Sequence, residues 1–327
     1  MITRRRFSTW LSAGALASPL AVFAQRKPEK LARIGYLSQG SETSNGAFLS
    51  AFRDALRDLG WIDGKNIVIE LHWAKPREFP QIAAELVKRK PDAIIGTCIP
   101  STRAAKLATA TIPVVMSVNG DPVESGLVAS LAHPGANVTG TSTLFEELVP
   151  KWLEFITAAV PKARTIAVMA NPFSITNDYW WNKVQQAAKQ LRVSVVRAEA
   201  TTQSELERAF ASMKKQRVSA FVMMTDGFWL SQIQRIVTLA SISQLPGIYG
   251  YREFAEAGGL MSYGLSYRDY YKGVARYVDK VLKGTKPAAL PVEQPTKIEL
   301  AVNVTTAKAL GLKIPEQLLL RADRVIE

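Results

Sequence analysis

The chain offers few residues of the types that enzymes use for nucleophilic or metal chemistry. Among its 327 residues, His72 and His133 are the only histidines and Cys98 is the only cysteine. Neither histidine has a cysteine or a second histidine at metal-site spacing, and one cysteine excludes an intrachain disulfide. The sequence has no G-x-S-x-G elbow, no P-loop and no G-x-G-x-x-G turn. We therefore expect no catalytic residue, no metal site and no cofactor.

Polar and acidic residues instead follow the β-rich runs of the chain, in the loops 38–46, 96–102, 119–122, 171–178, 225–229 and 249–251. Hydroxyls and helix-start N–H groups suit a carboxylate, and Asp121 or Asp226 suits an ammonium group. The aromatic candidates for an apolar wall are Tyr36, Phe173, Tyr179, Trp180, Trp229 and Tyr249. Each polar residue taken singly is more often a helix N-cap; taken together, the loops favour a binding site for a small zwitterion.

Short β-rich runs alternate with amphipathic helical segments, which is typical of α/β domains with parallel sheets. We expect strands at 33–37, 66–71, 93–96 and 113–118, with helices at 47–59, 81–89 and 101–109 between and around them. A second series has strands at 165–170, 193–198, 220–224 and 246–249 and helices at 180–190, 203–214 and 229–240. In such sheets a ligand binds at the carboxyl ends of the strands, where the polar loops lie.

The repeated series predicts two doubly wound parallel-sheet lobes joined by a hinge that the chain crosses several times. The expected N-terminal lobe is 31–141 plus about 260–290, and the C-terminal lobe is 142–259 plus about 291–327. The crossings are expected near Gly140–Leu144, near Gly258–Tyr263, and in the proline-rich tail after Lys286.

The first 25 residues have the features of an export signal. A basic start at Arg4, Arg5 and Arg6 precedes an apolar run at 11–23, which is shorter than the about 20 residues of a membrane span. Residues 3–7 resemble a twin-arginine signal, an ordinary Sec signal fits equally, and an anchored N-terminal helix is the alternative. Cys98 lies too far from the junction to be lipidated. We expect a soluble, monomeric protein in a Gram-negative periplasm.

The composition is that of a soluble globular protein, with 47% hydrophobic and 21% charged residues. The formal net charge is +13, and three of these charges leave with the leader, so the mature chain carries +10. Lysines and arginines are spread along the sequence without a basic stripe interleaved with aromatic residues. We therefore expect no nucleic-acid partner.

Several phrases in order carry a family resemblance, and they span residues 31–327. They are Arg33–Leu37, Ala51–Trp61, Gly64–Ile67, Gly120–Val123, Gly126–Ala132, Pro134–Gly140, Tyr249–Phe254, Ala257–Gly264 and Leu290–Thr296. The chain resembles the tryptophan-type periplasmic substrate-binding proteins of ABC transporters, which have the type I periplasmic-binding fold. It departs from the tryptophan-binding pattern at Asp178–Trp181, where bulky rings replace a polar stretch.

The resemblance implies a receptor that closes by hinge bending on a small organic ligand, an aromatic amino acid or related carboxylate, and delivers it to an inner-membrane permease. Carried over, it implies ligand contacts at Gly96, Thr97, Pro100, Ser101, Asp121, Asn171, Ser174, Asn177 and Asp226. The polar loops add Ser38, Gln39, Thr225 and Tyr249. Two other functions stay open: a binding module that senses a ligand for a signalling partner, and a periplasmic α/β enzyme that uses Asp121 or Asp226.

Overall fold

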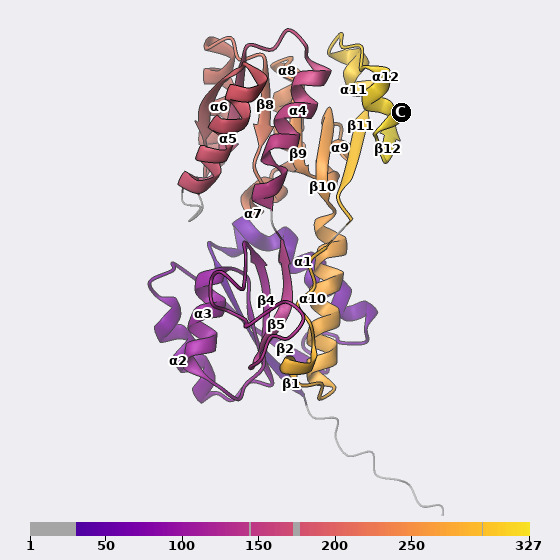
Figure 1. The fold of residues 1–327 in the computed structure, drawn as a ribbon. Helices are drawn as coiled ribbons and strands as arrows, with labels where there is room; N and C mark the ends of the chain where they lie inside the picture. Colours follow the sequence, from indigo (N-terminus) through magenta and orange to yellow (C-terminus); the bar gives the residue numbers. More distant parts are fainter. Residues whose placement is uncertain (1–30, 144, 173–176, 296) are drawn as a thin grey trace, which may run out of the picture. The chain divides into compact units, whose positions relative to one another are not determined.

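A computed structural model describes the chain from Leu31 to Glu327, except residues 144, 173–176 and 296. The expected leader and the candidate ligand residue Ser174 lie outside the described residues. Within them, the strands form two sheets, and each sheet is the centre of one lobe (Figure 1). None of the described helices is long and apolar enough to cross a membrane.

The first lobe has a parallel sheet with the strand order β2-β1-β3-β4-β5. Its strands are β1 (Ala32–Gln39), β2 (Ile67–Ala74), β3 (Ala93–Gly96), β4 (Val114–Asn119) and β5 (Val138–Thr143). Its helices are α1 (Glu42–Asp58), α2 (Phe79–Lys88), α3 (Ile99–Ala108) and α10 (Tyr267–Leu282), with the 3-10 turn η2 (Pro287–Ala289). Figure 1 shows α2 and α3 beside one face of this sheet, and α1 and α10 beside the other. Helices on both faces explain why β3 is buried along its whole length.

Helix α1 shows how hydrophobic spacing positions these layers. Leu49, Phe52 and Leu56 recur every three or four residues and are buried on the side that faces the sheet. The ring of Phe52 lies 5.9 Å from that of Tyr36 in β1. After the helix, Gly60 has a φ of 90°, a left-handed conformation that glycine adopts without strain and that stops the helix.

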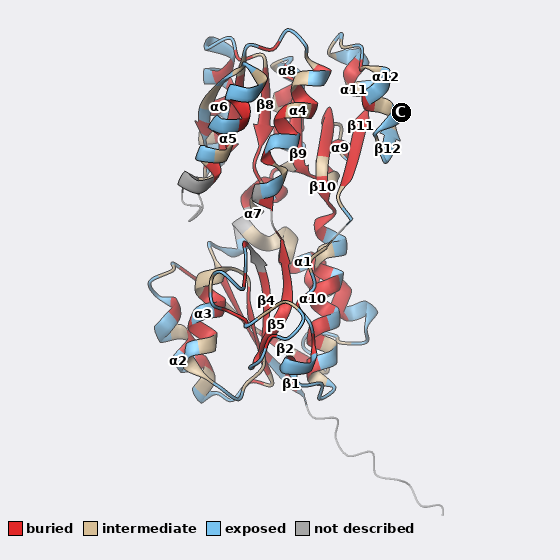
Figure 2. Ribbon diagram, in the orientation of Figure 1, coloured by how far each residue is buried: buried red, intermediate tan, exposed pale blue. Residues whose placement is uncertain are grey.

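The second lobe has a sheet with the order β12-β11-β10-β9-β8-β6-β7, in which only the β10–β11 pairing is antiparallel. Its strands are β6 (Thr165–Ala170), β7 (Ser194–Glu199), β8 (Ala220–Met223), β9 (Gly247–Tyr251), β10 (Met261–Leu265), β11 (Glu299–Asn303) and β12 (Arg324–Ile326). Its longer helices are α4 (Val149–Ala159), α5 (Asn177–Leu191), α6 (Gln203–Lys215) and α8 (Ile233–Ile242). The shorter ones are η1 (Phe145–Leu148), α7 (Gly227–Ser231), α9 (Arg252–Glu256), α11 (Val304–Ala309) and α12 (Glu316–Leu320). Figure 2 shows most strands of both sheets as buried, so the core of each lobe lies along its sheet.

The predicted α/β class, with two lobes of largely parallel sheet, is confirmed. Two details need correction. The helix expected at 229–240 is interrupted at Gln232, which separates α7 from α8. The return crossing expected near Gly258–Tyr263 lies later, because Met261–Leu265 is β10 and pairs with β9 in the second sheet. The chain reaches α10, beside the first sheet, only after Ser266; the lobe boundaries as a whole stay a prediction.

Candidate ligand-binding site

The first polar cluster lies at the carboxyl ends of β1 and β3, which are neighbours in the first sheet. Their register pairs Leu37 with Gly96, so the residues that follow each strand meet at one edge. The hydroxyls of Ser38 and Thr97 lie 2.8 Å apart, and the Thr97 N–H donates to the Leu37 carbonyl at 3.1 Å. Gln39 ends β1, and its carbonyl accepts from Asn45 Nδ2 at 2.8 Å. The structure therefore brings Ser38, Gln39, Gly96 and Thr97 together.

Gly96 is required by the close approach of the next helix. A Cβ at this position would lie 2.3 Å from Thr102 Oγ1 and 2.7 Å from Thr102 Cα. Thr102 Oγ1 also donates to the Gly96 carbonyl at 3.1 Å. The absence of a side chain at Gly96 thus lets α3 begin directly beside the strand end.

Ser101 and Pro100 shape the start of α3. Ser101 is fully buried; its Oγ donates to the Cys98 carbonyl at 3.0 Å and accepts from the Cys98 N–H at 3.2 Å. Pro100 occupies the first turn, where its missing N–H costs nothing. Burial raises the pKa of the Cys98 thiol. Ser101 is therefore a capping residue in this structure, and any ligand contact by it stays a prediction.

Asp121 follows β4 and begins a turn. Its Oδ1 accepts from the backbone N–H groups of Val123 at 2.7 Å and Glu124 at 3.1 Å, and the residue is exposed. This arrangement holds the turn that follows the strand. Asp121 is thus anchored by one carboxylate oxygen, at the edge where the first lobe presents Ser38 and Thr97.

In the second lobe, the ends of β6 and β8 bring Asn171 and Asp226 together. Asn171 Nδ2 donates to Asp226 Oδ2 at 3.0 Å, and the N–H of Phe228 donates to Asp226 Oδ1 at 2.8 Å, which makes Asp226 the N-cap of α7. Burial of the carboxyl raises its pKa, an effect that these two hydrogen bonds oppose. No Lys, Arg or His of the described residues forms an ion pair with Asp226. The negative charge of Asp226 is therefore stabilised by neutral hydrogen-bond donors alone.

The remaining residues of the second-lobe loops fall into two groups. Thr225 is half-buried and packs against β9, where a Cβ added at Gly250 would lie 2.4 Å from Thr225 Cγ2. Asn177 begins α5, but its side chain lies outside the described part, as do the side chains of Phe173 and Tyr179. The structure thus assembles Asn171, Thr225 and Asp226 at one edge of the second sheet.

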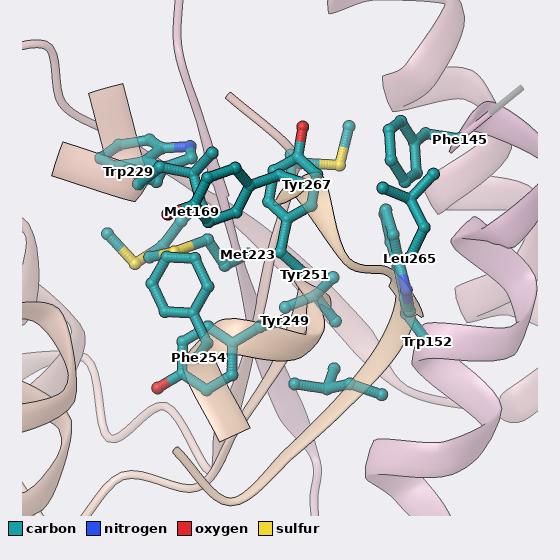
Figure 3. Close-up of a cluster of buried hydrophobic side chains, with 14 of the residues drawn as sticks. Phe145, Trp152, Met169, Met223, Trp229, Tyr249, Tyr251, Phe254, Leu265 and Tyr267 are labelled. Carbon is teal, nitrogen blue, oxygen red and sulfur yellow. The ribbon is translucent and has the colours of Figure 1, made fainter. Parts of the chain in front are cut away.

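Tyr249 lies in the core of the second lobe and not at its polar edge. Its ring stacks on Phe254 with centroids 4.7 Å apart, and burial raises the pKa of its phenol. In Figure 3 the rings of Tyr249 and Phe254 lie side by side, and Phe145 and Trp152 lie on the far side of Tyr251. Three other aromatic candidates, Tyr36, Trp180 and Trp229, are also buried in the core.

The sequence analysis placed Tyr251, the last residue of β9, in the candidate loop 249–251 but chose Tyr249 as the site residue. Its ring lies 6.3 Å from Phe48 of α1 and 5.5 Å from Phe145 of η1. Strand alternation places Tyr249 and Tyr251 on the same face, so the pattern alone did not separate a core ring from one at the strand end.

A surface pocket of about 230 Å³ lies elsewhere, between β7 and α6. It is lined by Arg197, Glu199, Glu205 and Arg208 among others, and these residues pair as Arg197–Glu199 at 3.8 Å and Arg208–Glu205 at 3.9 Å. Because the pocket supplies its own counter-charges, it has no evident preference for a charged ligand. The polar strand ends remain the better candidate site.

Catalytic groups are sparse around the strand ends. His72 lies on β2, where burial lowers the pKa of its imidazole. In the described ranges, no three His, Cys, Asp or Glu side chains are arranged to hold a metal ion. The chemistry of the assembled residues is hydrogen bonding by hydroxyls and amides around one half-buried carboxylate.

A family model described as "ABC transporter substrate binding protein" matches residues 41–326, nearly the whole described part. The chain belongs to this family. Substrate-binding proteins of ABC transporters bind small solutes and deliver them to a membrane permease, and this substrate-binding protein is such a solute receptor. Its recognised relatives are binding proteins and not enzymes.

Three relatives show how far the likeness extends. A tyrosine-binding protein of Clostridioides difficile is 31% identical over 265 residues, which cover 80% of this chain and 76% of the relative. The structure of an ABC domain from Streptococcus pneumoniae in complex with L-Trp has a TM-score of 0.71 at 26% identity, covering 90% of this chain and 99% of the other. A ligand-free, open substrate-binding protein from Clostridium difficile has a TM-score of 0.57 at 28% identity, with 90% and 99% covered.

Proposed function

We propose that this substrate-binding protein is a periplasmic receptor for an aromatic amino acid or a closely related zwitterion. Asp226 is the observation that carries the proposal. A half-buried carboxylate that only neutral donors stabilise gains from a cation, and a ligand ammonium group supplies one. The likeness to a tyrosine-binding protein and to a complex with L-Trp supports an amino acid as the source of that ammonium group.

The ligand carboxylate is expected on the first lobe. Ser38 and Thr97 present a pair of hydroxyls there, and the ten-residue helix α3 starts beside them with the positive end of its dipole. The carboxylate of an amino acid thus matches the first lobe, and its ammonium group matches Asp226 of the second lobe. The protein binds as a monomer, closes on the ligand by hinge bending and passes it unchanged to the permease, without nucleic acid as a partner.

A thermal-shift comparison of L-tyrosine, L-tryptophan and L-phenylalanine with their desamino acids tests this proposal. A ligand at 100 times its dissociation constant stabilises a protein by about 2.7 kcal/mol. We expect at least one of the three amino acids to raise the melting temperature, and its desamino analogue to have no effect, because the analogue lacks the partner of Asp226. Equal shifts from both compounds, or none from any amino acid, would refute amine recognition.

Export is tested on the same protein expressed from its own first residue in a Gram-negative host. We expect it in the periplasmic fraction, with a mass that lacks about the first 25 residues. Recovery of the uncleaved chain with the membranes would instead support the anchored N-terminal helix.

A further inference from the structure

The motif Tyr249–Phe254 contains three consecutive residues, Tyr251, Arg252 and Glu253, that contact the segments joining the two lobes. We call these three residues the hinge segment. The chain passes between the sheets after β5, after β10, and between Glu293 and β11. Glu293 still lies beside the first sheet, where it bridges to Thr141.

Tyr251 contacts the first and second of these connections. Its ring lies 5.5 Å from Phe145, which follows β5, and 6.3 Å from Tyr267, which follows β10, with nearly perpendicular ring planes in both pairs. Phe48 of α1 contacts both tyrosines, at 6.3 Å from Tyr251 and 6.1 Å from Tyr267. Tyr251 itself is only 7% exposed. One ring from the second lobe is therefore packed against both connections and the first helix. Figure 3 shows Tyr251 together with Phe145 and Tyr267.

Arg252 contacts the third connection and α10. Its Nη1 donates to Glu299 Oε2 at 2.9 Å, where β11 begins, and its Nη2 lies 3.5 Å from Asp269 Oδ2 in the first turn of α10. The guanidinium is 14% exposed and Glu299 is 9% exposed, so water screens this pair weakly.

Glu253 contacts the second connection again. Its Oε1 accepts from Ser266 Oγ at 2.6 Å, and Ser266 Oγ in turn accepts from the N–H of Asp269 as the N-cap of α10. Glu253 is buried, and burial raises the pKa of its carboxyl. The start of α10 is thus fixed to the hinge segment by a buried hydrogen bond.

The hinge segment also reaches the candidate ligand loop. The side chain of Thr225, the residue before Asp226, interacts with the phenol of Tyr251 and opposes the rise that burial causes in the pKa of that phenol. Gly250 makes this approach possible, because a Cβ there would lie 2.4 Å from Thr225 Cγ2 and 3.1 Å from the Trp152 ring. A ligand held by Asp226 therefore acts on a loop that packs directly against the residues at the start of the hinge segment.

We propose that the hinge segment fixes the three connections to one another, and that Tyr251 is a positioning residue that couples the ligand loop to them. The coupling of the ligand loop to the connections rests on the proposed function, since it requires a ligand at Asp226. Two separate parts of the Tyr251 side chain have these two roles. The ring contacts the connections, and the hydroxyl interacts with Thr225, which couples the ligand loop to them.

Two substitutions test the role of the Tyr251 ring and the role of its hydroxyl separately. Tyr251→Leu removes the ring contacts, and hydrogen exchange on the ligand-free protein measures the result. We expect amides at 145–148, 266–269 and 297–299 to exchange at least tenfold faster, while amides of β1 and β8 keep their protection. Faster exchange in the connections and in both core strands by the same factor would show general destabilisation and overturn the hinge role.

Tyr251→Phe keeps the ring and removes only the hydroxyl. We expect exchange in the connections to stay at the wild-type rate and the affinity for the amino acid found by thermal shift to fall about threefold to tenfold. Tyr249→Phe is the matched control, because that hydroxyl is buried two residues earlier with no partner in the described part, and its affinity should equal wild type.

The outcomes distinguish the two proposals. If wild-type protein binds no amino acid, the proposed function is wrong, and the coupling of Tyr251 to an amino acid is wrong with it. The hydrogen-exchange data alone then decide whether the hinge segment fixes the connections. If wild type binds and Tyr251→Phe binds as tightly as Tyr249→Phe, the coupling is wrong although the proposed function stands.

Discussion

Replacing Asp226 by asparagine is expected to weaken amino-acid binding by about 10- to 100-fold, because a hydrogen bond to a charged group contributes about 1.5–3 kcal/mol. The same change is expected to stabilise the ligand-free protein at neutral pH. Asparagine keeps an oxygen that accepts from the Phe228 N–H and caps α7, and it removes a half-buried charge that no cation of the described residues compensates. Titration calorimetry measures the first effect and thermal unfolding the second.

The pH dependence of that stabilisation follows from the direction of the pKa shift. Burial raises the pKa of Asp226 in the folded state, so the folded protein binds this proton more tightly than the unfolded chain does. Its contribution to stability is therefore most favourable below the unfolded pKa, and it is lost as the pH rises through the folded pKa. The advantage of Asp226→Asn over wild type should shrink on acidification.

Asp121→Asn is the matched control for both measurements. Asp121 also follows a strand and accepts backbone hydrogen bonds through its carboxylate, but it is exposed. We expect its replacement to leave the stability of the ligand-free protein close to wild type, because no buried charge is removed. If Asp226→Asn binds the amino acid as tightly as wild type, while Asp121→Asn loses affinity, the ammonium group lies on the first lobe.

Replacing Gly140 by alanine is expected to cost about 4 kcal/mol of folding stability, at the upper end for a single substitution. Gly140 lies in β5 opposite Met116 of β4 and has a φ of 133°. An added Cβ would lie 2.2 Å from the Met116 carbonyl oxygen and 2.6 Å from its nitrogen. Both are backbone atoms of the neighbouring strand, so the clash is relieved only by separating β4 from β5. Urea or thermal unfolding measures the loss.

Gly126→Ala is the control that separates the clash from the backbone conformation. Gly126 has a φ of 70°, and a Cβ there would meet no atom within 4 Å. Its replacement should cost only the about 1–2 kcal/mol of a left-handed alanine. Equal losses at the two positions would mean that the β4–β5 contact is not what requires Gly140.

The sequence predicts the strands and helices well where hydrophobic residues repeat in long runs, as in β1 and α1, because burial on a sheet or helix face requires that repeat. It misplaced the return crossing because Gly258 and Gly259 are typical of a linker. In the structure these glycines precede β10, and Gly264 within β10 approaches its neighbour so closely that a Cβ would lie 1.8 Å from the Gly250 carbonyl oxygen. Such a contact between strands is not visible in local sequence.

For the candidate site, the sequence predicts which residues meet but not what each side chain does. The meeting of Ser38 with Thr97, and of Asn171 with Asp226, follows from the rule that parallel neighbours end at one edge of a sheet. The role of each side chain does not follow from it. Whether Ser101 points to a ligand or caps its own helix, and whether Tyr249 or Tyr251 extends past the core, depends on the tertiary placement of neighbouring helices.

The stacking of Trp152 on Trp180 has an optical consequence. The two indole rings lie 5.9 Å apart with planes 17° from parallel, which is close enough for their electronic transitions to couple. Trp180 lies in α5, directly after the loop that follows β6, and Trp152 Nε1 donates to the Tyr263 carbonyl in β10 at 2.6 Å. Circular dichroism in the indole bands therefore reports, without any added label, how α5 is placed against the strand that leads into the second connection.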